Sequence, residues 1–148
     1  MLQSRPTPAG ERIIEPMIAL ARCSKLQRII VAGSHSGELM FALHRRGYIR
    51  VATTSNCGLP SGQYDLALVD WRERSIRALE STLDWLVEFL PPTGLLVVWV
   101  DPQERAGNRK LRSALERHGF RIEAGTIHEH GSAVCAQRRE TGPVRKVA

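Results

Sequence analysis

The stretch Val31–Leu39, VAGSHSGEL, has the residue types of a loop that can bind an anionic or nucleotide ligand. Gly33 and Gly37 have no Cβ, so a ligand can approach the backbone closely there, and amides at the start of a helix face outward. Ser34 and His35 stand between the two glycines. We expect these four residues to hold a cofactor, although the same stretch could serve only to join a strand to a helix.

A second pair of candidate residues, Asp70 and Trp71, comes at the end of the apolar stretch YDLALVDW. In a doubly wound sheet, ligands bind beside the carboxyl ends of strands where the strand order reverses. Asp70 could therefore hold a substrate amine or a ribose, and Trp71 could stack on a base. The structural alternative is that Asp70 caps a helix that begins near Glu73, a common role for an aspartate before a helix. The two roles are compatible.

No metal site is predicted. His128 and His130 are two residues apart, so on a strand they share a face, but the sequence places no third ligand beside them. We interpret them as exposed imidazoles of a turn.

The formal net charge of +6 raises the question of a nucleic-acid partner. Most of the basic excess lies near the two ends, and after Gln137 it comes from Arg138, Arg139, Arg145 and Lys146. A basic face could instead be formed by Arg45, Arg46, Arg50, Arg72, Arg74 and Arg77. Because arginine is ordinary on helix surfaces, we expect RNA binding to be weak and to depend on the tail after Gln137.

The three cysteines, Cys23, Cys57 and Cys135, are far apart and odd in number, which argues against a disulfide framework and favours a reducing cytoplasm. No apolar run is long enough to span a membrane, so no membrane partner is expected. The sequence does not fix the oligomeric state, and a homodimer is left open.

The elements that must position the candidate residues alternate between strand and helix. We expect one domain over residues 13–139, with a flexible leader over 1–12 and a flexible basic tail over 140–148. Helices are expected over 13–24, with Pro16 at the helix start, and over 37–47, 76–90 and 104–119. Strands are expected over 27–33, 48–54, 64–70, 95–101, 120–127 and 130–139.

This order predicts an α/β fold of three layers, in which a doubly wound, mostly parallel sheet of about six strands has helices on both faces. The connection between the last two strands is too short for a helical crossover. These two strands must therefore run antiparallel.

With these elements, the sequence resembles the class I S-adenosylmethionine-dependent methyltransferases over roughly residues 27–139. Four stretches carry the resemblance: IIVAGSHSG, YDLALVD, FLPPTGLLVVWV and LRSALERHGFRIEAG. The resemblance implies a Rossmann-like sheet with a reversed strand, S-adenosylmethionine as cofactor, and methyl transfer to a small molecule or RNA. The cofactor-binding residues that it implies are Gly33, Ser34, His35, Gly37 and Asp70, and Trp71 would contact substrate.

The chain departs from the family pattern at several positions. Val31 stands where the family has an acid, and His35 stands where it has a middle glycine, at a cost of about 1 to 2 kcal/mol if the His35 backbone is left-handed. Residues 53–56, TTSN, lack the acid that accepts from the ribose hydroxyls. Residues 55–63 are too few for the helix, strand and helix found there in the family. We therefore expect a shallow, open pocket.

Three functions remain open on the sequence. A methyltransferase needs no visible catalytic dyad, because the sulfonium already activates the methyl group, and no catalytic residue is predicted. The alternative is a degenerate, non-catalytic member of the fold, a cofactor-free binding or assembly module. A third reading is an NAD(P)-binding Rossmann protein, since Gly33 and Gly37 fit the loop of short-chain dehydrogenases. The catalytic tyrosine and lysine pair of that family is missing after both Tyr48 and Tyr64.

Overall fold

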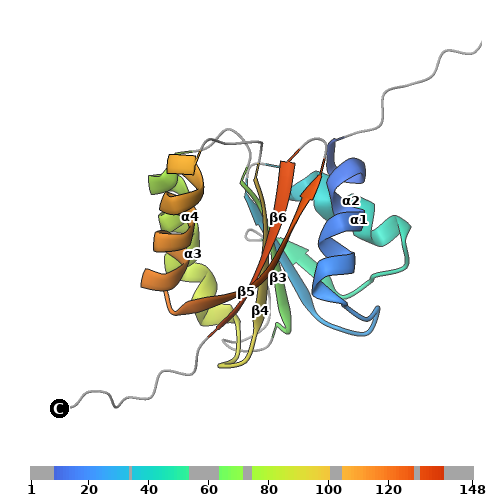
Figure 1. Ribbon diagram of the computed structural model, residues 1–148. Helices are drawn as coiled ribbons and strands as arrows, with labels where there is room; N and C mark the ends of the chain where they lie inside the picture. Colours follow the sequence, from blue (N-terminus) through green and yellow to red (C-terminus); the bar gives the residue numbers. More distant parts are fainter. Residues whose placement is uncertain are drawn as a thin grey trace, which may run out of the picture.

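The computed structural model describes residues 9–33, 35–53, 64–71, 75–100, 105–128 and 131–138. Six strands form one sheet in the order β2-β1-β3-β4-β6-β5. The elements in chain order are α1 (Ala9–Ala21), β1 (Ile29–Gly33), α2 (Ser36–Arg45), β2 (Val51–Thr53), β3 (Leu66–Trp71), α3 (Ile76–Leu86), the 3₁₀ turn η1 (Val87–Phe89), β4 (Leu95–Val100), α4 (Arg105–Arg117), β5 (Phe120–His128) and β6 (Gly131–Arg138) (Figure 1).

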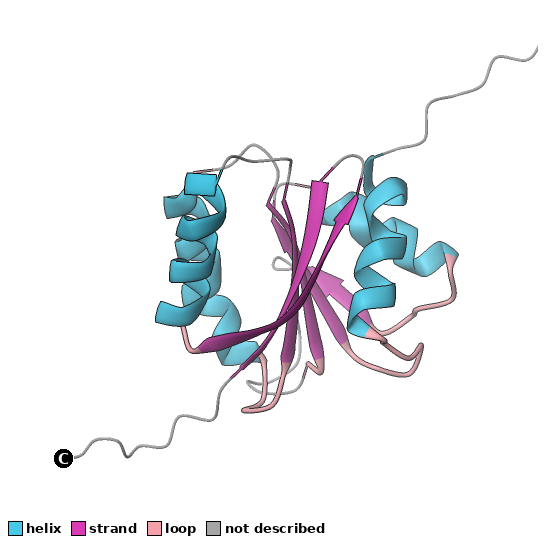
Figure 2. Cartoon of the chain, viewed as in Figure 1, coloured by secondary structure: helices cyan, strands magenta, loops and turns pink. Residues whose placement is uncertain are grey.

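The sheet is mixed in the way the sequence predicts. Strands β2, β1, β3 and β4 pair in parallel, whereas β6 pairs antiparallel with both β4 and β5. Helices α1 and α2 cover one face of the sheet, and α3 and α4 cover the other (Figure 2). The three-layer, doubly wound α/β architecture with a reversed strand near its C-terminal end is therefore confirmed.

The central strands are buried on both faces, which explains their nearly unbroken apolar sequences. Along β1, Ile30 packs into the core beneath α3 and α4, and its neighbour Val31 packs into the core beneath α1 and α2. The same alternation runs through β3 and β4. The sheet thus separates two apolar cores.

Among the described helices, none is long and apolar enough to cross a membrane.

Helix α1 differs from the prediction at its start. It begins at Ala9, four residues before the expected domain boundary, and Pro16 lies inside it instead of at its first position. Packing explains this, because Ile13, Ile14 and Met17 are all buried against the sheet, and that burial outweighs the N–H that proline lacks. The rest of the predicted leader, residues 1–8, and the predicted tail, 140–148, lie outside the described residues.

Arg138, whose charge was counted with the basic end of the chain, lies in the last predicted strand and belongs to the folded domain. It is the last residue of β6, and its Nη1 donates to the carbonyl oxygen of Val87 at 2.7 Å and to that of Leu90. Its positive charge therefore stabilises the end of η1.

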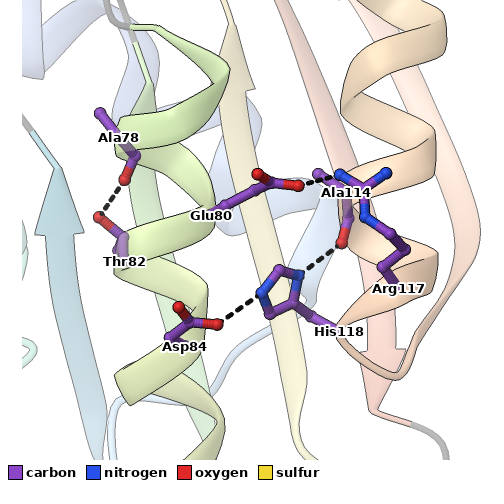
Figure 3. Close-up of polar contacts among 7 residues, drawn as sticks. All are labelled: Ala78, Glu80, Thr82, Asp84, Ala114, Arg117 and His118. Carbon is purple, nitrogen blue, oxygen red and sulfur yellow. Dashed lines mark hydrogen bonds and ion pairs between the residues drawn. The ribbon is translucent and has the colours of Figure 1, made fainter.

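Helices α3 and α4 are joined by two polar contacts between their surfaces (Figure 3). The guanidinium of Arg117 pairs with the carboxylate of Glu80. One turn further along α3, the His118 Nε2 lies 2.8 Å from Asp84 Oδ1, and the His118 Nδ1 lies 2.8 Å from the Ala114 carbonyl oxygen. These contacts join α4 to α3 at the outer surface of the helix layer.

We expect His118→Ala to lower the free energy of unfolding by about 1 kcal/mol, because the hydrogen bond that the imidazole N–H donates is lost. The effect stays small because the Asp84 side chain is 71% exposed, and solvent screens its interaction with the imidazole. Urea denaturation followed by circular dichroism measures the change. A loss equal to that of a buried leucine would contradict this account of the contact.

Candidate functional site

The strand order reverses between β1 and β3. The chain passes from β1 to its neighbour β2 on one side, and from β3 to its neighbour β4 on the other. In this arrangement, a crevice outside the carboxyl ends of the two central strands is the expected ligand site. Gly33, at the end of β1, is paired in register with Asp70, near the end of β3. Two of the predicted site residues are therefore neighbours at the switch point.

Gly33 is required by the contact between these two strands. Its φ is +110°, and a Cβ at this position would lie 2.1 Å from the backbone carbonyl oxygen of Asp70. No side chain fits at such a separation. The observed reason for a glycine here is thus the close approach of the β3 backbone, which also holds Asp70 next to the glycine loop.

Asp70 carries a fully buried carboxylate. The sequence interpretation that Asp70 caps the following helix is wrong, because α3 begins at Ile76 and its N-cap is Ser75, whose Oγ accepts from the Ala78 N–H at 3.1 Å. The side chain of Asp70 is 0% exposed. A buried carboxylate is costly unless it is paired, and such groups concentrate at functional sites.

His35 lies beside that carboxylate. Its Nδ1 is 3.5 Å from Asp70 Oδ2, and its side chain is 43% exposed, so the imidazole helps to shield Asp70 from solvent on the outer side. The His35 backbone has φ −128° and ψ 45°, outside the left-handed region, so the strain considered from the sequence does not arise. His35 occupies the N-cap position of α2 without a side-chain capping bond, and Ser36, the expected cap, is the first helical residue.

Gly37 lies in the first turn of α2 and faces open space. It is exposed, and among the described residues no heavy atom other than its chain neighbours and the backbone of α2 itself lies within 4 Å of the Cβ position. The start of α2 is therefore approachable at Gly37, as the glycine pattern predicts. Ser34, the fourth residue of the predicted loop, lies outside the described residues.

Trp71 is placed in the core beneath α3 and α4. It is 6% exposed, and its indole Nε1 donates to the Ser75 carbonyl oxygen at 3.1 Å. Stacking on a base, as expected from the sequence, would require this ring to leave the core. We therefore do not include Trp71 in the site proposed below.

At the end of β2, Thr53 is buried, and residues 54–63 lie outside the described part of the chain. Strand β2 forms one edge of the described sheet, with only Val51–Thr53 paired to β1. This placement agrees with the short connection noted in the sequence. No aspartate or glutamate occurs in residues 51–63 that could serve a ribose.

Trp99 lies next to the site, although the sequence marks it only as a core residue. It pairs in register with Asp70, is 2% exposed, and its Nε1 has no hydrogen-bond partner among the described residues. The ring of His128 stacks on it with centroids 5.6 Å apart. The signal that could have found Trp99 is its place near the carboxyl end of the strand that pairs with β3.

The histidines and arginines singled out in the sequence are dispersed. His128 contacts Thr126 and Trp99, while His130 lies outside the described residues, and the described part contains no group of three side chains suited to a metal ion. Arg45 and Arg46 belong to α2 and its end, whereas Arg77 belongs to α3 on the opposite face of the sheet. The described arginines therefore do not form the single basic face considered as an alternative.

The two described cysteines are expected to react slowly with iodoacetamide at pH 8. Burial raises the pKa of the Cys23 thiol and that of the Cys135 thiol, so at a given pH less of each is the reactive thiolate than in a free cysteine. Peptide-resolved mass spectrometry during alkylation measures both rates. Unfolding in urea should bring them to the rate of a free thiol, and rates that are already equal in the folded protein would contradict the prediction.

Comparison of the sequence with protein-family models and with curated proteins gives no match. Comparison of the fold with solved structures gives many. An S-adenosylmethionine-dependent methyltransferase from Aquifex aeolicus has a TM-score of 0.62 and 12% identity, with 88% of this chain and 93% of that chain covered.

Two further structures extend the comparison. The 1,6-didemethyltoxoflavin-N1-methyltransferase of Burkholderia thailandensis, solved with bound S-adenosylhomocysteine, has a TM-score of 0.58 and 14% identity over 88% of this chain and 79% of that one. The [4+2]-cyclase SpnF has a TM-score of 0.57 and 14% identity over 87% and 81%. One fold here carries different reactions, so the likeness shows architecture and not activity. The chain has the Rossmann-like fold of the class I S-adenosylmethionine-dependent methyltransferases.

Proposed function

We propose that this chain binds S-adenosylmethionine between the carboxyl ends of β1 and β3 and transfers the methyl group to an acceptor. The observation that carries the proposal is the fully buried Asp70 carboxylate at the switch point, next to the approachable first turn of α2. A buried negative charge in this position suits a ligand that carries an ammonium group. The fold is one that known enzymes use with this cofactor.

The residues present fit the amino-acid end of the cofactor better than its ribose. Amides in the first turn of α2, around Gly37, would face the ligand carboxylate, and Asp70 would accept from the ligand ammonium. The bound cofactor would supply a methyl group already activated by a sulfonium. The protein then needs mainly to align the acceptor and exclude water, so no catalytic residue is assigned.

The ribose end of the cofactor has weaker support. Because residues 51–63 contain no acid, a ribose would find only neutral acceptors there. Replacing a charged acceptor by a neutral one weakens binding by about fivefold, since the free-energy difference is on the order of 1 kcal/mol. We therefore expect an affinity lower than that of a complete site.

His35 is proposed as a cover over Asp70. The imidazole lies where the family pattern has a glycine, and it must move aside before a ligand ammonium can reach the carboxylate. The same contact favours a second candidate function, a cofactor-free binding or assembly module in which His35 and Asp70 pair permanently.

Isothermal titration of the full chain with S-adenosylmethionine, S-adenosylhomocysteine and NADP separates the candidates. We expect heat with the two adenosyl compounds and none with NADP. Heat with NADP alone would favour the dinucleotide-binding alternative. Silence with all three ligands at about millimolar concentration, which corresponds to less than about 4 kcal/mol of binding free energy, would favour the cofactor-free module.

A further inference from the structure

A cationic groove lies between α3 and α4, on the opposite face of the sheet from α1 and α2. It is an open groove with a volume of about 340 Å³, and its lining includes Ile76, Arg109, Lys110, Ser113 and Arg117. Three of these five side chains are cationic. None of them belongs to the candidate site described above.

The direction of the groove follows from the register of the two helices. Glu80 contacts Arg117, and Asp84 contacts His118, so α3 and α4 run side by side in the same direction (Figure 3). Each helix follows the carboxyl end of a parallel strand, β3 for α3 and β4 for α4. Arg109 therefore lies two turns nearer than Arg117 to the carboxyl ends of the parallel strands, where Asp70 lies.

Among the described residues, the positive charge of the groove is least compensated at the end nearest the carboxyl ends of the parallel strands. At the far end, Arg117 is paired with Glu80. Arg109 and Lys110 are exposed and make no ion pair within the described part of the chain, and Arg77 is exposed on the first turn of α3. This end of the groove is thus suited to an anionic ligand.

We infer that this groove binds single-stranded nucleic acid through its phosphate backbone. The groove follows α4 for eight residues, about 12 Å, so a strand can place phosphates at Arg109 and Lys110 and continue toward Arg117, whose charge is shared with Glu80. Cationic grooves of this kind track the backbone of single strands, and a hydroxyl such as that of Ser113 adds a neutral donor. Ile76 provides an apolar surface for a sugar or a base.

This inference stands apart from the proposed cofactor site, because it concerns other residues and requires no S-adenosylmethionine. It also replaces the expectation from the sequence that nucleic-acid binding depends on the C-terminal tail. Arg109, Lys110 and Arg117 all lie on α4, and Ile76 of α3 forms the facing wall of the groove.

Fluorescence anisotropy with a labelled single-stranded RNA of mixed sequence tests the inference on the full chain, without cofactor, over a series of KCl concentrations. The double variant Arg109→Ala, Lys110→Ala should bind about tenfold more weakly and reduce the slope of log affinity against log salt by about 1.4, for two lost phosphate contacts. Both changes are on an exposed helix surface, where alanine is a good helix former, and circular dichroism checks the fold.

Two control variants remove similar charge elsewhere. Lys25→Ala with Arg50→Ala removes two exposed cations. Lys25 precedes β1 and Arg50 precedes β2, so both lie near the amino ends of the parallel strands, away from the groove end at Arg109. Arg139→Ala with Arg145→Ala and Lys146→Ala removes charge from the tail. Both are expected to bind RNA within about twofold of the parent, since neither touches the groove.

Several outcomes would overturn the inference. These are an unchanged affinity in the groove variant, an equal loss in the Lys25 and Arg50 control, a loss confined to the tail variant, or no RNA binding by the parent. Polyglutamate that displaces the RNA at equal charge concentration would also overturn it, because the groove would then select charge and not a nucleic-acid strand.

Discussion

Gly33→Ala is expected to lower the free energy of unfolding by more than about 3 kcal/mol. The residue has φ +110°, where an L side chain is strained, and its Cβ would lie 2.1 Å from the Asp70 carbonyl oxygen. Neither strand can yield easily, because β1 and β3 are both central in the sheet and packed against helices. Urea denaturation followed by circular dichroism measures the loss.

Gly37→Ala is the matched control for this change. It lies four residues further along the same loop and helix, without a positive φ and with open space around its Cβ position. Alanine there should stabilise the protein by up to about 1 kcal/mol, because glycine is the poorer helix former. Equal effects of the two substitutions would refute the close contact between β1 and β3. Because Gly33 supports the sheet itself, its variants are unsuited to testing ligand binding.

His35→Gly is expected to tighten the binding of S-adenosylhomocysteine about tenfold, whereas Asp70→Asn should weaken it by about tenfold or more. The first change removes the ring whose Nδ1 lies 3.5 Å from the carboxylate, and the second removes the negative charge while keeping the shape. Glycine is accepted at the N-cap position that His35 occupies, so α2 should persist. Isothermal titration with each variant gives the affinities.

The opposite signs of these two effects make the test specific. His44→Ala changes an exposed histidine in the last turn of the same helix and should leave the affinity unchanged. If His35→Gly instead weakens binding, the imidazole is itself a contact for the ligand, and the cover proposed for Asp70 does not exist. If Asp70→Asn has no effect, the buried carboxylate does not meet the ligand.

The sheet could be predicted from the sequence because its strands are buried on both faces and its turns are short. The apolar run that ends at Gly33 and the one that ends near Asp70 have the composition of parallel central strands, and the tight connection before Gly131 permits only an antiparallel pair. The start of α1 could not be predicted in the same way. Residues that flank Pro16 are held helical by burial against the sheet, which a local rule about proline does not include.

The site was predictable only as far as strand order determines it. The switch-point rule brings Gly33 and Asp70 together, and the structure pairs them in register. The cap assigned to Asp70 was wrong because Ser75, much nearer the helix, provides the hydroxyl that accepts from Ala78. The contact of His35 with Asp70 depends on side-chain placement that spacing alone does not determine.

The groove between α3 and α4 was not predictable for a related reason. Its cations all lie on α4, but the wall that faces them, Ile76, comes from α3, and which residues of the two helices face each other does not follow from the spacing within one helix. Arg45 and Arg77, which the sequence analysis considered for one basic face, are instead separated by the sheet.

The central claim is that an adenosyl ligand binds at the carboxyl ends of β1 and β3. Hydrogen–deuterium exchange of the full chain, with and without S-adenosylhomocysteine, tests this claim most directly. The account predicts slower exchange in the peptides that cover residues 33–39 and 66–71, and none that covers α4 should change. Unchanged exchange throughout at saturating ligand, or protection centred on residues 109–117, would contradict it.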